Sequence, residues 1–118
     1  MSLPLSIAQQ NDLFRSMVHI PQFGSPDIDG KVLVTRSIAA LPPVTQIVIL
    51  ARVRDFDAFT PDNDPYGEHD FGAFTEPDAG KVFWKIDYFD RDYRHHSSDP
   101  ADPAVTRRVL TVMLADEY

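Results

Sequence analysis

Residues 62–72, which read DNDPYGEHDFG, hold the densest group of side chains that could do chemistry in this chain. Glu68, His69 and Asp70 are residue types that serve as general acids and bases. In an extended segment Glu68 and Asp70 share one side, and with Asp87 nearby one carboxyl pKa would be raised. These three residues are therefore the candidate catalytic group of a metal-assisted or carboxylate-based hydrolase.

The same stretch is also typical of a structural turn. Asp62 and Asp64 can accept backbone N–H groups in Asx-type turns, while Pro65 and Gly67 shape the backbone. His69 can then bond a neighbouring backbone group instead of taking part in catalysis. Loops of this composition usually serve geometry, so the sequence favours the structural turn over the active site.

A metal site is the third interpretation of this stretch, and the spacing argues against the best-known version. A calcium loop needs an oxygen ligand at its fifth position and a bidentate Glu at its twelfth, where this chain has Tyr66 and Ala73. A looser site using His69, with His95 and His96 from a later loop, stays open. The chain has no Cys and no phosphate-binding glycine motif. We therefore predict neither a bound metal nor a cofactor.

Acidity is the remaining signal, because the net charge is −7 and residues 55–70 contain no Lys or Arg. An acidic surface repels nucleic acid but fits a basic groove on another protein. We therefore expect a protein partner with a basic surface, no direct nucleic-acid binding and no membrane. The expected binding residues are Asp55, Asp57, Asp62, Asp64 and Glu68. The absence of Cys and of a secretory signal predicts a cytoplasmic protein.

The sequence patterns around these residues predict a single α+β domain over residues 1–118. In this domain, helices lie on one face of a small antiparallel sheet. Alternating apolar residues predict a hairpin that pairs 69–75 with 81–90, with Val82, Trp84 and Ile86 facing the core. A strand is expected at 31–36, after a loop at 21–30. Apolar spacing and caps predict helices at 7–18, 44–56 and 103–117.

Three strings together resemble a protein family: NDPYGEHDFG at 63–72, WKIDYFD at 84–90 and DPADPAVTRRVLTVMLADEY at 99–118. The family consists of short alphaproteobacterial proteins catalogued as a domain of unknown function. Its members often have a second Tyr where this chain has Phe89. The resemblance implies a single domain and frequent residence on plasmids or mobile regions, and it implies no activity.

Three functions therefore compete. The first is a non-catalytic binding module that acts through residues 55–70, with host defence or nucleic-acid-processing machinery as a possible partner. The second is the hydrolase, and the third is a structural subunit of an oligomer, whose oligomeric state the sequence does not predict. The direction of the side chains of Glu68, His69 and Asp70 separates the first two. Convergence on one concave pocket favours the enzyme, and an exposed acidic ridge favours binding.

Overall fold

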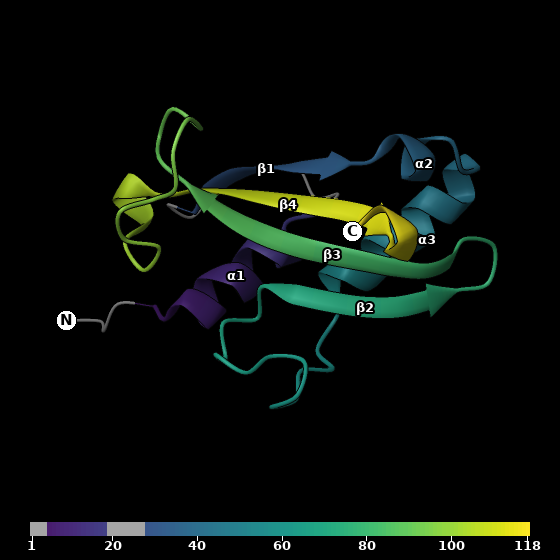
Figure 1. The fold of residues 1–118 in the computed structure, drawn as a ribbon, viewed down its shortest axis with the longest axis horizontal. Coiled ribbons are helices and arrows are strands. Elements are labelled where there is room, and N and C mark those ends of the chain that lie inside the picture. Colours follow the sequence, from purple (N-terminus) through teal and green to yellow (C-terminus); the bar gives the residue numbers. More distant parts are fainter. Residues whose placement is uncertain (1–4, 19–27) are drawn as a thin grey trace.

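The computed structural model describes residues 5–18 and 28–118. Its elements are α1 (Ile7–Ser16), β1 (Asp29–Val34), α2 (Arg36–Ala39), α3 (Pro43–Arg54), β2 (Phe71–Glu76), β3 (Gly80–Phe89) and β4 (Arg107–Leu114), with short 3₁₀ turns at Pro103–Val105 and Ala115–Glu117 (Figure 1). Residues 21–27 of the expected loop lie outside the described residues. Within these residues, none of the helices has the length and apolar character needed to cross a membrane.

The four strands form one sheet in the order β1-β4-β3-β2. The pairs β2–β3 and β3–β4 are antiparallel, and β1 runs parallel to β4. The predicted α+β class is confirmed, and the predicted hairpin is present as β2 and β3. The sheet is mixed and not purely antiparallel. After β1 the chain passes through α2, α3 and the hairpin, and β4 then lies beside β1 and runs parallel to it.

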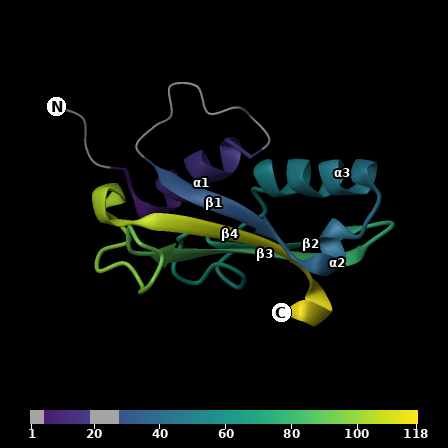
Figure 2. The ribbon, with the colours of Figure 1, turned by 90° about the horizontal axis from the view of Figure 1, so that it is seen from above.

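Both long helices cover the same face of the sheet, while the C-terminal turn lies on the other side (Figure 2). The predicted start of α1 is correct. The Ser6 hydroxyl accepts a hydrogen bond from the Gln9 N–H at 3.1 Å, and the Gln9 side chain accepts one from the Ser6 N–H. The predicted helix at 44–56 is α3, and it begins at Pro43. The helices and the sheet enclose a core that includes Phe14, Ile38, Ile49, Val53, Val82, Trp84, Ile86, Leu110 and Val112.

The C-terminal helix predicted at 103–117 is wrong, because residues 107–114 form the strand β4. The predicted N-cap at Asp102 is present, because its carboxylate accepts a hydrogen bond from the Ala104 N–H at 2.9 Å. The helical turn that it caps ends after three residues. As a central strand, β4 is buried on both faces, with Leu110 fully buried and Met113 only 4% exposed. A strand that is apolar on both faces produces a near-continuous apolar run, which sequence spacing does not distinguish from a buried helix.

Trp84 links this core to the segment that follows α3. Its side chain is fully buried, as predicted, and the rings of Phe56 and Phe59 meet it edge to face at centroid distances of 5.6 and 6.2 Å. Gly72 on β2 makes room for it, because a Cβ at this position would lie 2.3 Å from the Trp84 indole nitrogen. The start of the loop is therefore packed onto the sheet through aromatic rings.

Candidate functional site

Residues 55–70, here called the acidic loop, connect α3 to β2. The guanidinium group of Arg15 on α1 fixes its beginning by donating to the backbone oxygens of Val53 and Phe56, both at 2.8 Å. The same group lies 4.7 Å from the centroid of the Trp84 ring, and Arg15 is only 3% exposed. This buried arginine therefore ties α1, the end of α3 and the core together under the loop.

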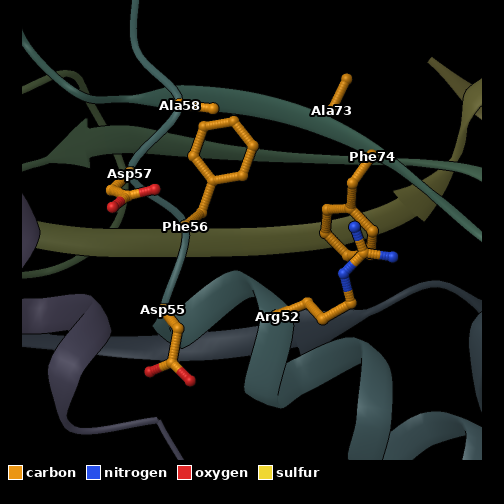
Figure 3. A pocket seen from close by; sticks show the side chains of 7 residues that line it. All are labelled: Arg52, Asp55, Phe56, Asp57, Ala58, Ala73 and Phe74. Atoms are coloured by element: carbon orange, nitrogen blue, oxygen red, sulfur yellow. The ribbon is translucent and has the colours of Figure 1, made fainter.

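A surface depression lies beside the start of the acidic loop (Figure 3). Its volume is about 360 Å³, and it is lined by Arg52, Asp55, Phe56, Asp57, Ala58, Ala73 and Phe74. Figure 3 shows the rings of Phe56 and Phe74 lining it, with Asp57 beside Phe56 and the Asp55 carboxylate pointing away from both rings. The depression thus combines apolar walls with two exposed acidic side chains.

Asp64 forms the structural centre of the loop. Its carboxylate accepts the backbone N–H of Glu68 at 3.1 Å and that of His69 at 3.3 Å, and its side chain is only 6% exposed. The Asp64 N–H in turn donates to the Thr60 oxygen at 2.8 Å. Gly67 has a φ of 64°, a value that favours glycine. Asp64 therefore accepts backbone N–H groups, as expected, but from four and five residues later in the chain, so the contact is not the Asx turn that was predicted.

His69 is the second fixed point of the loop. Its ring stacks on Phe59 with a centroid distance of 4.0 Å, and its Nδ1 lies 2.9 Å from the Asp12 carboxylate on α1. Its Nε2 lies 3.7 Å from Asp64, and its backbone has a φ of 56°, which is uncommon outside glycine. Asp12 also pairs with Arg15 at 2.8 Å. No feature of the sequence predicted that His69 would contact α1.

Glu68 and Asp70 are partly buried, and both pKa values are raised. Burial is the main cause for Glu68, Asp70 adds to it, and a hydrogen bond with Tyr88 opposes it. Burial also raises the pKa of Asp70, with further contributions from Asp64 and Asp87. Neighbouring carboxylates therefore add to both raised pKa values, but burial is the larger cause of each.

A buried polar cluster lies behind Glu68, and the sequence analysis missed it. Asn11 on α1 donates to the Tyr88 hydroxyl at 2.8 Å and to the Glu68 backbone oxygen at 2.9 Å. It accepts a hydrogen bond from Nε of Arg108 at 2.7 Å, and Arg108 is fully buried. Burial raises the pKa of Tyr88 and lowers that of Arg108. The signal that could have predicted this cluster is the presence of polar residues on the side of α1 that the amphipathic pattern predicts to be buried.

The candidate catalytic residues are neighbours in the chain, and His69 lines a depression whose lining, in the part of the chain that the structure describes, does not include Glu68 or Asp70. His69 and Asp64 line a shallow depression together with Phe59, Thr60, Pro61, Pro65, Tyr66 and Gly67. Glu68 is partly buried, and its backbone oxygen and the Tyr88 hydroxyl share Asn11 as a hydrogen-bond donor, while Asp70 immediately precedes β2. Of the candidate binding residues, Asp55, Asp57 and Asp62 are exposed, Asp64 is turned inward and Glu68 is partly covered.

Metal ligands can also be assessed from the side chains. In residues 5–18 and 28–118, no three or more His, Asp or Glu side chains are grouped so that they could hold a metal ion. His95 and His96 lie in the loop after β3, where the His96 ring stacks on Phe89 at a centroid distance of 5.7 Å. They lie apart from His69, which contacts Asp12 and Asp64.

The raised pKa values predict how stability depends on pH. An acid with a raised folded-state pKa binds more protons in the folded protein, so stability falls as pH rises above its ordinary value, 4.5 for Glu68 and 3.8 for Asp70. Glu68→Gln and Asp70→Asn should therefore melt at or above the wild-type temperature at pH about 7, with a smaller difference at pH about 4. Thermal melts across this range, with Asp62→Asn as the control for net charge, measure the effect. Lower melting temperatures of both variants at neutral pH would contradict it.

Most of the chain matches a known family. The family model described as Protein of unknown function (DUF3768) matches residues 34–117. This range contains α3, the acidic loop and the strands β2 to β4, while α1, which supplies Arg15 and Asp12, precedes it. No curated protein and no solved structure matches the chain.

Proposed function

Because the chain belongs to the DUF3768 family, whose description assigns no activity, we propose its function from the acidic loop: a non-catalytic module that binds a basic surface of another protein. The observation that carries this proposal is a fixed backbone with exposed acidic side chains. Asp64, His69 and Arg15 hold the loop in place through the contacts described above. A loop that is ordered before binding loses less conformational entropy when it docks.

The exposed side chains of the loop are suited to an interface. Asp55, Asp57 and Asp62 point into solvent, and Tyr66 at the tip is 86% exposed. Tyrosine is enriched among the residues that dominate binding energy, and carboxylates around it select a positively charged partner. Within the described residues, Asp57 and Asp62 make no ion pair, so both remain available to a partner.

The depression in Figure 3 is the place where we propose that a lysine or arginine side chain of the partner docks. The aliphatic part of such a side chain would pack against Phe56, and its charged end would meet Asp57. Asp55 contributes less, because Arg54 already contacts it at 2.9 Å. Arg52, whose guanidinium carbon lies 4.4 Å from the centroid of Phe74, limits the site at one side.

Grooves rich in Lys and Arg are typical of proteins that hold nucleic-acid phosphates. An acidic module can occupy such a groove, whereas its net charge of −7 opposes contact with the nucleic acid itself. We therefore propose host defence or nucleic-acid-processing machinery as the first class of partner to test.

The proposal predicts that loss of two loop charges weakens partner capture. Immobilised wild-type protein and an Asp57→Asn/Asp62→Asn variant would be exposed to nuclease-treated host lysate over a range of salt concentrations. Asp92→Asn/Asp116→Asn removes the same charge from exposed positions elsewhere and is the matched control. We expect roughly tenfold less of a specific protein on the loop variant, unchanged capture by the control, and weaker capture in high salt. Equal capture by both variants would contradict the proposal.

A carboxylate-based hydrolase is the second candidate, and the raised pKa values of Glu68 and Asp70 favour it. This function requires that Glu68→Gln abolish turnover of an ester or phosphoester substrate while the melting curve stays native. The binding module requires instead that Glu68→Gln leave partner capture largely intact, because this side chain is partly buried whereas Asp57 and Asp62 are exposed. The two measurements on one variant therefore separate the candidates.

A further inference from the structure

Strand β2 stands at one end of the strand order, so it forms an edge of the sheet as the structure describes it. Just before β2, the Asp70 oxygen accepts a hydrogen bond from the Ile86 N–H on β3 at 2.8 Å. In an antiparallel pair, successive residues point their backbone groups alternately toward the neighbouring strand and away from it. The N–H and C=O groups of Phe71, Ala73 and Thr75 therefore point away from β3.

This outer edge of β2 borders the depression of Figure 3. The Thr75 oxygen accepts a hydrogen bond from Arg52 on α3, which agrees with its outward direction. Ala73 lines the depression, and among the described residues its backbone groups make no hydrogen bond. Natural proteins often protect an edge strand with Lys or Pro, and β2, which reads FGAFTE, contains neither. The edge at Ala73 can therefore pair with a further strand.

The alternation of side chains determines which residues of such a strand would enter the depression. Gly72 and Phe74 face the helix-covered side of the sheet, and Ala73 faces the other side. Residues directly opposite one another in paired strands lie on the same side. The residue opposite Ala73 would thus point away from the helices, while its two neighbours would point toward α3 and the acidic loop.

The charges along the depression distinguish these two neighbours. The Arg52 guanidinium lies 4.4 Å from the centroid of the Phe74 ring, so it repels a basic side chain opposite Phe74. Phe56 packs on the tryptophan that pairs with Gly72, and Figure 3 shows Asp57 beside Phe56. A basic side chain opposite Gly72 would therefore meet an aromatic ring and an exposed carboxylate.

We propose that the basic partner docks as an extended segment that adds an antiparallel strand to β2, exchanges backbone hydrogen bonds with Ala73 and places one Lys or Arg opposite Gly72. This inference rests on the proposed binding function and specifies the form of the partner. Strand addition obtains affinity from main-chain hydrogen bonds and specificity from pockets for alternate side chains. The edge of β2 supplies the hydrogen bonds, and the depression supplies the pocket.

Magnetic resonance titration of the full chain with the capped peptide Thr-Val-Lys-Val-Thr tests the proposal on unchanged protein. The amide signals of Ala73 and Asp57 should shift and saturate. With Lys opposite Gly72, the Val nitrogens face β2, so methylating them should weaken binding at least about tenfold. Methylating the Lys nitrogen, which faces away, is the matched control and should change binding less than about twofold. Equal effects of the two methylations, or no shift at Ala73, would overturn strand addition.

Proline variants test the same edge in the protein. Ala73→Pro removes the outward N–H at a position where edge strands tolerate proline, and it should weaken peptide binding roughly tenfold. Val32→Pro places the same residue in β1 at the opposite edge of the sheet and should bind as wild type does. Circular dichroism verifies both folds, and the methylated peptides decide the question if Ala73→Pro does not fold. A folded Ala73→Pro protein that binds as wild type does would overturn strand addition.

The same variant separates this inference from the proposed function on which it rests. Capture of a lysate protein that requires Asp57 and Asp62 but is unchanged in Ala73→Pro would overturn strand addition and leave the binding function intact. Capture that requires none of the three residues would overturn both. Capture that Ala73→Pro and the loss of the two carboxylates each weaken would support both.

Discussion

Arg108→Ala should lower the free energy of unfolding by about 3 kcal/mol, the largest loss that we expect from one side chain in the polar interior. The fully buried guanidinium donates to Asn11 Oδ1 at 2.7 Å and to the Pro100 backbone oxygen at 3.2 Å. Truncation leaves both oxygens without their donor and opens a cavity beside Tyr88. Urea denaturation of wild type and variant gives the difference directly.

Two further variants make this prediction specific. Arg108→Met keeps much of the volume and should lose less stability, because no carboxylate within residues 5–18 and 28–118 pairs with this buried charge. Arg107→Ala is the matched control: it removes a neighbouring arginine that forms an ion pair with exposed Asp29, and it should lose under about 1 kcal/mol. An Arg108→Ala protein as stable as Arg107→Ala would show that the cluster contributes nothing.

Local patterns predicted much of the fold correctly. The hairpin followed from alternation around Trp84, and α3 was recognised although its β-branched residues favour a strand. These elements depend on contacts close in sequence or on one apolar face. The prediction for β4 was wrong because the environment of this strand is set by its neighbours on both sides, β1 and β3. Parallel pairing of β1 with a strand more than 70 residues later leaves no local signal in either segment.

The candidate site shows the same division. The turn chemistry of Asp64 and Gly67 was predictable, since their geometric roles arise within a few residues. The contacts of His69 with Asp12 and of Arg15 with the start of the loop join segments about 40 to 60 residues apart, so they depend on the tertiary fold. Spacing also could not show that Glu68 is partly buried while Asp57 and Asp62 stay exposed.

Asp64→Ala should lower the free energy of unfolding by about 2 kcal/mol, because it leaves the N–H groups of Glu68 and His69 without their acceptor. The same change removes the carboxylate beside His69 Nε2, so the stacking of that ring on Phe59 should loosen. Asp64→Asn retains one oxygen acceptor and should lose less stability. Asp62→Ala, two residues earlier and exposed, should melt close to wild type.

This comparison decides between the two interpretations of DNDPYGEHDFG. A structural turn requires that stability follow the order wild type and Asp62→Ala, then Asp64→Asn, then Asp64→Ala, in urea denaturation and in thermal melts alike. It also requires that Asp64→Ala weaken partner capture indirectly, by disordering a loop whose exposed charges at Asp57 and Asp62 are unchanged. If Asp64→Ala instead unfolds like wild type, the carboxylate is not needed for the turn. Its burial beside His69 would then be better explained by chemistry, and the hydrolase would become the stronger candidate.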